Sequence, residues 1–409
     1  MLMKKVAARI VLAAAAAGVA GAAWAEDGPI KVGFVGGLTG ACAALVEDEL
    51  NAVRMGVDEL NAAGGILGRQ VELVVRDSQT KPDEGAKQSR ELIVGEDIDL
   101  LTGVCSSSVM LAMTAVSKEL KVPFYSAIGS TQKANVEAYQ PYFWQVQANA
   151  TMEAVAAAEY VAKKPEWRRI VPMGFDYEWG HSSVDAFTTH LKKLRPEIEI
   201  TDPIFPKVGE ANMAPYITAA LAKQPDAIFA AVFGGGLASL IKQGQGYGMF
   251  ERSNLVTLLT VDALQSMGDA MPKERVFGVA RAPFFAIEDS EDARAFIAHY
   301  RSKYGEYPTD WSINGYDGLM FYAAAAEAAG SVEPDALMKA VHEITFDGLR
   351  GNALKVRAFD GQMNAPSYVG EVSFEDGYDF AIMKNVEVYA GEALMWPEET
   401  IQAARDAAK

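Results

Sequence analysis

Two hydrophobic periodicities alternate along most of the chain. Short apolar runs, at 31–35, 70–76 and 100–104, are followed by longer segments in which apolar residues recur every three or four positions. The short runs are typical of buried strands and the longer segments of amphipathic helices. Because strands that alternate with helices form parallel βαβ units, the sequence predicts an α/β fold.

The alternation restarts after residue 146, which indicates a second unit of similar size; 409 residues are enough for two domains. Its predicted strands are 169–173, 198–204, 226–233, 255–260 and 276–279, and two further helices are predicted at 290–304 and 312–329. In the last fifty residues, strand-like runs at 354–358, 367–374 and 380–389 are separated by Asp-Gly pairs, which favour turns. We therefore expect two doubly wound parallel-sheet lobes and a β-rich C-terminal extension.

The first 25 residues have the features of an export signal. Lys4, Lys5 and Arg9 precede an alanine-rich apolar run that ends in Ala23-Trp24-Ala25, a small-X-small cleavage site. Cleavage near Ala25 changes the formal charge from −17 to about −20. A protein this acidic repels nucleic acid and anionic membranes, so neither is an expected partner. We expect a soluble exported protein.

Two hydroxyl-rich turns follow neighbouring predicted strands. Ser106, Ser107 and Ser108 come after the run 100–104 and open a helix, and Ser130 follows the run 122–126. The carboxyl ends of parallel strands share one sheet edge, where open α/β sheets bind ligands. The first N–H groups of a helix lack intrahelical partners and favour negative charge. The sequence therefore predicts an anion site, with helix capping as the alternative role of each serine.

Other motifs lack the residues that their chemistry requires. The glycine-rich run 36–40 does not have the GxGxxG spacing of a dinucleotide site. Ser130 and Lys133 match the SxxK of serine acylases, but the chain has neither SDN nor KTG. The four histidines have no zinc-ligand spacing. We expect no cofactor or metal, and an exported serine hydrolase that uses Ser130 stays open as an alternative.

Four segments together carry a resemblance: KVGFVGGLTG, NAAGGILGRQVELVVRD, GVCSSSV and VPFYSAIGS, in this order after a signal peptide. The chain resembles the type I periplasmic binding proteins of the leucine/isoleucine/valine-binding family over essentially the whole mature sequence. The resemblance implies a periplasmic protein, not an enzyme, that closes on a small ligand and delivers it to an inner-membrane ABC permease. It implies three crossings between lobe 1, at 26–145 and 279–358, and lobe 2, at 146–278 and 359–409.

The resemblance also implies roles for individual residues. Ser106 and Ser130, with the backbone at Ile128 and Gly129, would hold a ligand carboxylate, and Asp262 would receive an ammonium. Three positions where the family usually carries aromatic residues that cover the ligand are here Leu45, Trp179 and Phe233. These departures make the expected pocket more apolar and remove hydroxyl donors, so the side-chain specificity of the best-known members does not carry over. A neutral branched-chain or other apolar amino acid is the first expected ligand. Aromatic or other organic acids are the alternative, in which case Asp262 would need another partner.

The two cysteines, Cys42 and Cys105, would tend to form a disulfide in an oxidising compartment. In the family, the partner of Cys105 lies near the end of the second strand, where this chain reads RDSQTKPDE without a cysteine. The strand order of the family places Cys42 and Cys105 side by side, so we expect a bridge between them.

Overall fold

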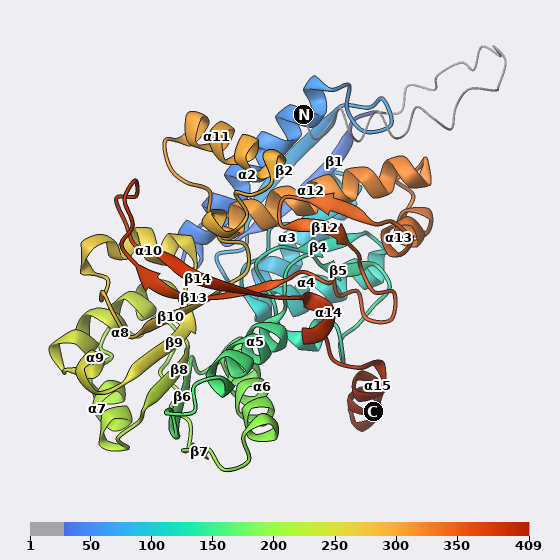
Figure 1. The fold of residues 1–409 in the computed structure, drawn as a ribbon. Helices are drawn as coiled ribbons and strands as arrows, with labels where there is room; N and C mark the ends of the chain where they lie inside the picture. The colour runs from blue at the N-terminus through green and yellow to red at the C-terminus, as the bar shows by residue number, and fades with distance from the viewer. Residues whose placement is uncertain (1–27, 409) are drawn as a thin grey trace, which may run out of the picture.

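Two β-sheets form the two halves of the molecule, and helices cover their faces (Figure 1). The computed structural model describes residues 28–408, so the predicted signal peptide at 1–25 lies outside the described residues. Buried apolar side chains of the strands and helices form the core, as the alternating pattern predicts. The predicted α/β fold is confirmed. Between residues 28 and 408, no helix has the length and apolar character needed to span a bilayer.

The first sheet is fully parallel, with the strand order β2-β1-β3-β4-β5. This order reverses between β1 and β3, and open α/β sheets bind ligands at such a switch point. The loop that carries Cys42 follows β1, and the serine turn follows β3. The elements are β1 (Ile30–Gly36), α2 (Ala43–Ala62), β2 (Val71–Asp77), α3 (Pro82–Gly95), β3 (Leu100–Thr102), α4 (Ser107–Leu120), β4 (Phe124–Ser126), η2 (Gln132–Ala134) and β5 (Phe143–Gln145).

The second sheet has the order β14-β13-β10-β9-β8-β6-β7. Its strands from β10 to β7 are parallel, and the antiparallel pair β13 and β14 forms one edge. The elements are α5 (Ala150–Ala162), β6 (Arg169–Gly174), α6 (Glu178–Leu194), β7 (Glu199–Ile200), α7 (Ala214–Ala222), β8 (Ala227–Ala231), α8 (Gly234–Gly246), α9 (Met249–Arg252), β9 (Asn254–Leu258), α10 (Val261–Met267), η3 (Gly268–Ala270), β10 (Val276–Ala280), β13 (Ser367–Ser373) and β14 (Ile382–Tyr389).

Between β10 and β13 the chain forms elements that do not join either large sheet. In this region α12 packs against α2, and α13 packs against α12. The elements are η4 (Phe284–Ala286), α11 (Glu291–Tyr304), α12 (Asp310–Ala329), α13 (Pro334–Glu343), and the hairpin of β11 (Phe346–Gly348) and β12 (Gly351–Leu354). The residue boundaries predicted for the two lobes stay a prediction; β10 extends to Ala280, two residues past the predicted boundary at 278.

Three buried amides alternate along the segment that leads from β5 to α5. Gln145 donates to the Thr131 carbonyl at 3.0 Å, and Gln147 donates to the Gly129 carbonyl at 2.8 Å. Asn149 donates to Oε1 of Gln362 at 3.0 Å. Because alternate residues of an extended segment point to the same side, this spacing places all three amides on one side. The segment is thereby hydrogen-bonded to the turn after β4 and to the later segment that leads into β13.

Two predicted strands differ from the observed ones. Only Glu199–Ile200 of the run 198–204 forms a strand, because Pro203 has no N–H group to donate to a ladder. The strand predicted at 354–358 is wrong, since β12 ends at Leu354.

The β-rich end of the chain is the β13–β14 pair, and two helices that the strand pattern did not predict follow it. They are α14 (Gly391–Leu394) and α15 (Glu398–Ala407). Arg405 of α15 donates to the backbone carbonyls of Asn135 and Val136. The last helix is therefore attached to the first half of the molecule.

Candidate ligand-binding site

A cavity of about 300 Å³ lies where the carboxyl ends of strands from both sheets face each other. Its walls come from the loops after β1, β3 and β4 on one side and from residues after β6, β8 and β10 on the other. Six of the eight residues that the sequence predicts for the ligand site line this cavity: Leu45, Ser106, Ile128, Ser130, Trp179 and Phe233. The structure therefore brings together residues from both halves of the chain: the serine turns, which the strand ends predict, and Trp179 and Phe233, which the resemblance implies.

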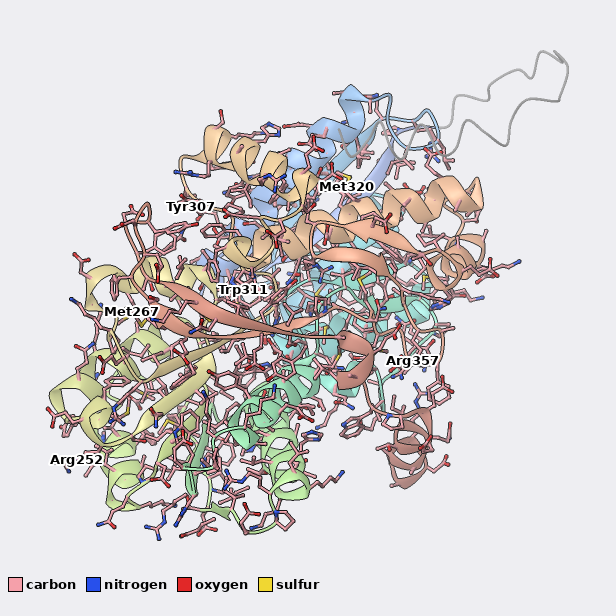
Figure 2. All side chains as sticks on the ribbon, viewed as in Figure 1. Arg252, Met267, Tyr307, Trp311, Met320 and Arg357 are labelled. Carbon is pink, nitrogen blue, oxygen red and sulfur yellow. A yellow bond between two sulfur atoms is a disulfide. The ribbon has the colours of Figure 1, made fainter. Side chains whose placement is uncertain are left out.

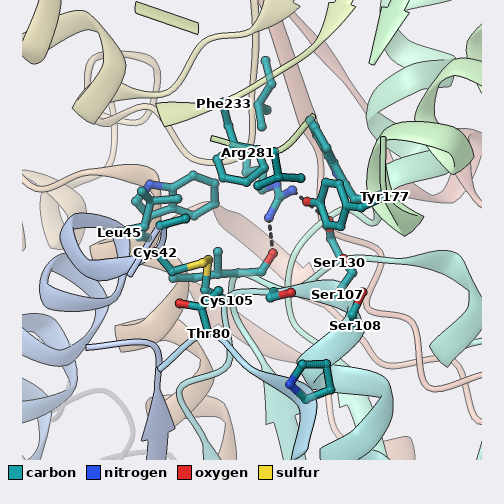
Figure 3. Close-up of a pocket in the computed structure, with 18 residues that line it drawn as sticks. Cys42, Leu45, Thr80, Cys105, Ser107, Ser108, Ser130, Tyr177, Phe233 and Arg281 are labelled. Carbon is teal, nitrogen blue, oxygen red and sulfur yellow. Dashed lines mark hydrogen bonds between the residues drawn. A yellow bond between two sulfur atoms is a disulfide. The ribbon is translucent and has the colours of Figure 1, made fainter. Parts of the chain in front are cut away.

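The serine turn opens α4 toward the cavity. Ser106 is the N-cap residue, with extended backbone angles of −74° and 130°, and its side chain makes no capping hydrogen bond. A hydroxyl at this position that does not cap the helix is free to contact a ligand. Ser107 and Ser108 also line the cavity (Figure 3). The turn therefore supplies hydroxyls and unpaired helix N–H groups to one end of the cavity.

The predicted disulfide between Cys42 and Cys105 is present, with a Cα–Cα distance of 6.2 Å. Both cysteines line the cavity next to the serine turn (Figure 3). The bridge joins the loop after β1 to the loop after β3, on either side of the switch point of the first sheet. It therefore restrains the position of Ser106, which is the neighbour of Cys105.

A buried arginine that the sequence interpretation missed forms the centre of the polar wall. Arg281 directly follows β10, is 2% exposed and lines the cavity. Its Nη2 donates to Oγ of Ser130 at 2.8 Å, and its Nη1 donates to the Ile128 carbonyl at 2.6 Å. The guanidinium thus connects the second sheet to the turn after β4 of the first. Its sequence signal is a single charge immediately after the apolar run VFGVA.

Two carboxylates fix Arg281. Glu153 of α5 accepts from Nε at 2.6 Å and from Nη2 at 3.0 Å, so the buried charge is paired in a bidentate geometry. Burial raises the pKa of Glu153, and the adjacent guanidinium opposes that shift. Asp310, at the start of α12, accepts from the backbone N–H groups of Arg281 and Ala282 at 2.8 Å each. The side chain and backbone of Arg281 are therefore both held in place.

Gly129 and Asp262 do not line the cavity. The N–H of Gly129 donates to the Val104 carbonyl at 3.0 Å, so it is not free for a ligand carboxylate. Asp262 accepts a hydrogen bond from Nε1 of Trp311 at 2.9 Å, and it is Trp311 that faces the cavity. Burial raises the pKa of Asp262 to about 6. An ammonium acceptor at Asp262 stays a prediction that this placement does not favour.

Aromatic rings form a large part of the cavity lining. The ring centroids of Tyr177, Trp179 and Phe233 lie 5.8 to 6.4 Å from one another, and all three residues line the cavity. Figure 3 labels Tyr177 and Phe233. Leu45 and Trp311 complete the apolar surface. The predicted Trp179 and Phe233 are thus joined by Tyr177, which precedes α6 and was not predicted. Such a wall suits the apolar body of a small ligand.

The charges around the cavity do not fit a serine hydrolase. Among the described lining residues, Arg281 is charged, and no Asp, Glu, His or Lys is present. Lys133, the lysine of the SxxK match, forms an ion pair of 2.7 Å with Glu178. Ser130 accepts its hydrogen bond from a guanidinium, which is not a proton acceptor. Elsewhere in residues 28–408, no group of three or more side chains is placed to bind a metal ion.

A family model described as periplasmic binding protein matches residues 29–378, most of the chain. The chain belongs to the periplasmic binding protein family. Curated relatives of this periplasmic binding protein include the leucine-, isoleucine-, valine-, threonine- and alanine-binding protein of Pseudomonas aeruginosa. The two sequences are 22% identical over 357 residues, which cover 84% of this chain and 90% of the relative.

Solved structures of similar fold include proteins with two kinds of ligand. A branched-chain amino acid substrate-binding protein of Streptococcus pneumoniae, in complex with isoleucine, has a TM-score of 0.77 and 22% identity and covers 88% of this chain and 99% of its own. A solute-binding protein of Rhodopseudomonas palustris, in complex with 3,4-dihydroxybenzoic acid, has a TM-score of 0.79 and 21% identity. The match covers 89% of this chain and 98% of that protein. At these identities the likeness shows the fold of this periplasmic binding protein.

Proposed function

We propose that this protein captures a small carboxylate-bearing solute with an apolar body in the periplasm and delivers it to an ABC permease in the inner membrane. One observation carries the proposal: the cavity between the sheets is lined by serine hydroxyls and a guanidinium together with aromatic rings. A carboxylate stripped of water needs charged or hydrogen-bonding partners, and Ser106, Ser130 and Arg281 supply them. The protein is a binding protein and not an enzyme in this proposal.

Two classes of solute meet this description. The relatives that bind branched-chain amino acids support a neutral apolar amino acid, with leucine, isoleucine and valine first. The absence of Asp and Glu from the described cavity lining supports carboxylates without an amino group, aromatic acids included. Export through a signal peptide cleaved near Ala25 belongs to the same proposal, because the permease is reached from the periplasm.

Release of the natural ligand tests the function directly. The protein is purified from its host without a ligand-removing step and denatured, and the released small molecules are identified by mass spectrometry. We expect one small carboxylate per chain. Ser106→Ala should lower the affinity for that compound about tenfold, because a hydrogen bond to a charged group contributes about 1.5–3 kcal/mol. A protein that retains no carboxylate and binds none from a broad panel would contradict the proposal.

The hydrolase alternative has a separate readout. Incubation with activated esters or β-lactams, followed by intact mass measurement, should leave the chain without a covalent adduct. An adduct on Ser130 would reverse this conclusion.

A further inference from the structure

We propose that Arg281 determines the ligand class, selecting carboxylates without a neighbouring ammonium group over the corresponding amino acids. This inference rests on the proposed function, that a small carboxylate binds in the cavity between the sheets, and adds a residue and a chemical class to it. The relevant contrast is between a ligand that is anionic overall and a zwitterion of the same shape.

The hydrogen bonds of Arg281 leave one of its N–H groups free to bind an anion. A guanidinium has five N–H groups. Nε and Nη2 donate to Glu153, Nη2 also donates to Ser130, and Nη1 donates once to Ile128. One N–H on Nη1 has no hydrogen-bond partner among the described residues. Because Arg281 lines the cavity, this N–H is available to a ligand carboxylate or carbonyl oxygen.

The hydrogen bond from Arg281 also leaves the Ser130 hydroxyl free to act as a donor. The Ser130 oxygen accepts from the guanidinium, so its own O–H is free to donate. Because Ser130 lines the cavity, this O–H can donate to a ligand. With Ser106 and the positive charge of Arg281, the lining offers hydrogen-bond donors and a cation to a ligand, which is complementary to a carboxylate, whereas the guanidinium repels an ammonium group.

An ammonium group has no carboxylate partner among the described residues that line the cavity. No Asp or Glu is among the described lining residues, and the carboxylates of Glu153 and Asp310 are occupied by Arg281 and the backbone beside it. Asp262 accepts from Trp311 and lies outside the lining. The α-ammonium of an amino acid is one carbon away from its carboxylate, so it would stand close to the guanidinium without a counter-ion. Burying a charge in this way weakens binding.

Matched ligands test the inference on the full mature chain. Affinities are measured by calorimetry for leucine, 4-methyl-2-oxopentanoate and 4-methylpentanoate, and for phenylalanine, phenylpyruvate and 3-phenylpropanoate. We expect at least one of the acids to bind about tenfold or more tightly than the amino acid of its series. The double variant Arg281→Gln, Glu153→Gln removes both buried charges together and should bring the ratio of affinities close to one. Arg281→Lys keeps the charge and should keep the preference.

A second buried ion pair provides the control. Arg350 and Asp317 form an ion pair of 2.8 Å, and Arg350 also donates to a backbone carbonyl, but neither residue lines the cavity. The double variant Arg350→Gln, Asp317→Asn should lower stability and leave the ratio of affinities unchanged, so the ratio separates selection from a structural role.

The possible results are distinct. Binding of no carboxylate by the wild type would end the proposed function itself. Tighter binding of the amino acids by the wild type, or an unchanged ratio in the Arg281→Gln, Glu153→Gln variant, would overturn the inference about Arg281 and leave the proposed function standing.

Discussion

Nε1 of Trp311 donates a 2.9 Å hydrogen bond to Oδ1 of Asp262, and this bond joins the start of α12 to the start of α10. The next residue back, Asp310, accepts from the Val261 N–H at 3.0 Å. Two consecutive residues of α12 thus hold the segment that follows β9. Trp311 lies near the middle of the molecule (Figure 2). Its indole is fixed as part of the cavity wall, and the carboxylate of Asp262 accepts from it.

Substitution of Asp262 therefore distinguishes a structural role from an ammonium partner. Asp262→Asn keeps an acceptor for Trp311 and should bind the ligand within about threefold of the wild type, whereas Asp262→Ala should lower the free energy of unfolding by about 1–2 kcal/mol. Urea unfolding and calorimetry measure both quantities. Abolished amino-acid binding in Asp262→Asn would mean that the carboxylate receives the ammonium after all.

Asp48 should make the protein less stable in alkaline solution. Burial, with the nearby charges of Asp262, Glu306 and Glu47, raises the pKa of Asp48 to about 8, although Thr309 donates to its carboxylate at 3.0 Å. The folded state then holds a proton that the unfolded state releases near pH 4. The contribution of protonated Asp48 to the free energy of unfolding is complete below about pH 4 and is lost as the pH rises through about 8.

Urea unfolding at pH 6 and pH 9 measures this effect. The wild type should lose about 1–2 kcal/mol between the two pH values, a figure kept small because the side chain is partly exposed to solvent. Asp48→Asn retains an acceptor for Thr309 without a titrating group, so it should lose less. Equal losses in the two proteins would show that Asp48 is not responsible.

Loss of the disulfide should affect both stability and binding. Cys42 and Cys105 are 63 residues apart, and closing a loop of that length stabilises a fold by about 4 kcal/mol. The double variant Cys42→Ser, Cys105→Ser should lose most of this stability and bind ligand more weakly, because the serine turn is less restrained. Intact mass with and without reductant checks the bond, and two free thiols in the oxidised protein would contradict it.

Glu178 should slow the separation of the two halves. At the start of α6, it accepts from Lys133 at 2.7 Å and from Thr131 at 3.0 Å, and both partners follow β4 of the other sheet. Burial would raise the pKa of Glu178, but the hydrogen bonds from Lys133, Ser182 and Thr131 outweigh it and lower the pKa. Glu178→Gln should release ligand a few times faster, because partly exposed pairs contribute about 1 kcal/mol or less.

Stopped-flow measurement of ligand dissociation tests the role of Glu178. Glu84→Gln is the matched control, since Glu84 pairs with Lys87 within α3 and does not connect the sheets. Equal rates of ligand release in both variants would show that Glu178 does not slow the separation of the two halves.

Strand ends were predictable from the sequence because a polar residue after an apolar run marks the sheet edge where ligands bind. Ser106 and Ser130 follow such runs, and Arg281 follows VFGVA in the same way, but a single charge after a strand is as typical of a surface residue as of a ligand site. Which polar group turns toward the cavity is decided by partners distant in sequence. Asp262 illustrates this, since its orientation depends on Trp311, 49 positions later.

The helix α15 was missed for a different reason. Pro397 at its N-cap and Glu398 and Glu399 in its first turn are ordinary helix-start signals, but the Asp-Gly turns upstream directed the interpretation to strands.

The division of the cavity between two sheets has an evolutionary consequence. The hydroxyls that we propose hold a carboxylate come from turns after β3 and β4, and Arg281 follows β10, whereas the rings of Tyr177, Trp179 and Phe233 come from residues after β6 and β8. Substitutions at Tyr177 or Phe233 can therefore alter the accepted shape without disturbing the serine turn. After gene duplication, substitutions in the aromatic part of the lining alone could therefore change which solute is bound. The serine turns would meanwhile stay under selection to bind the acid group.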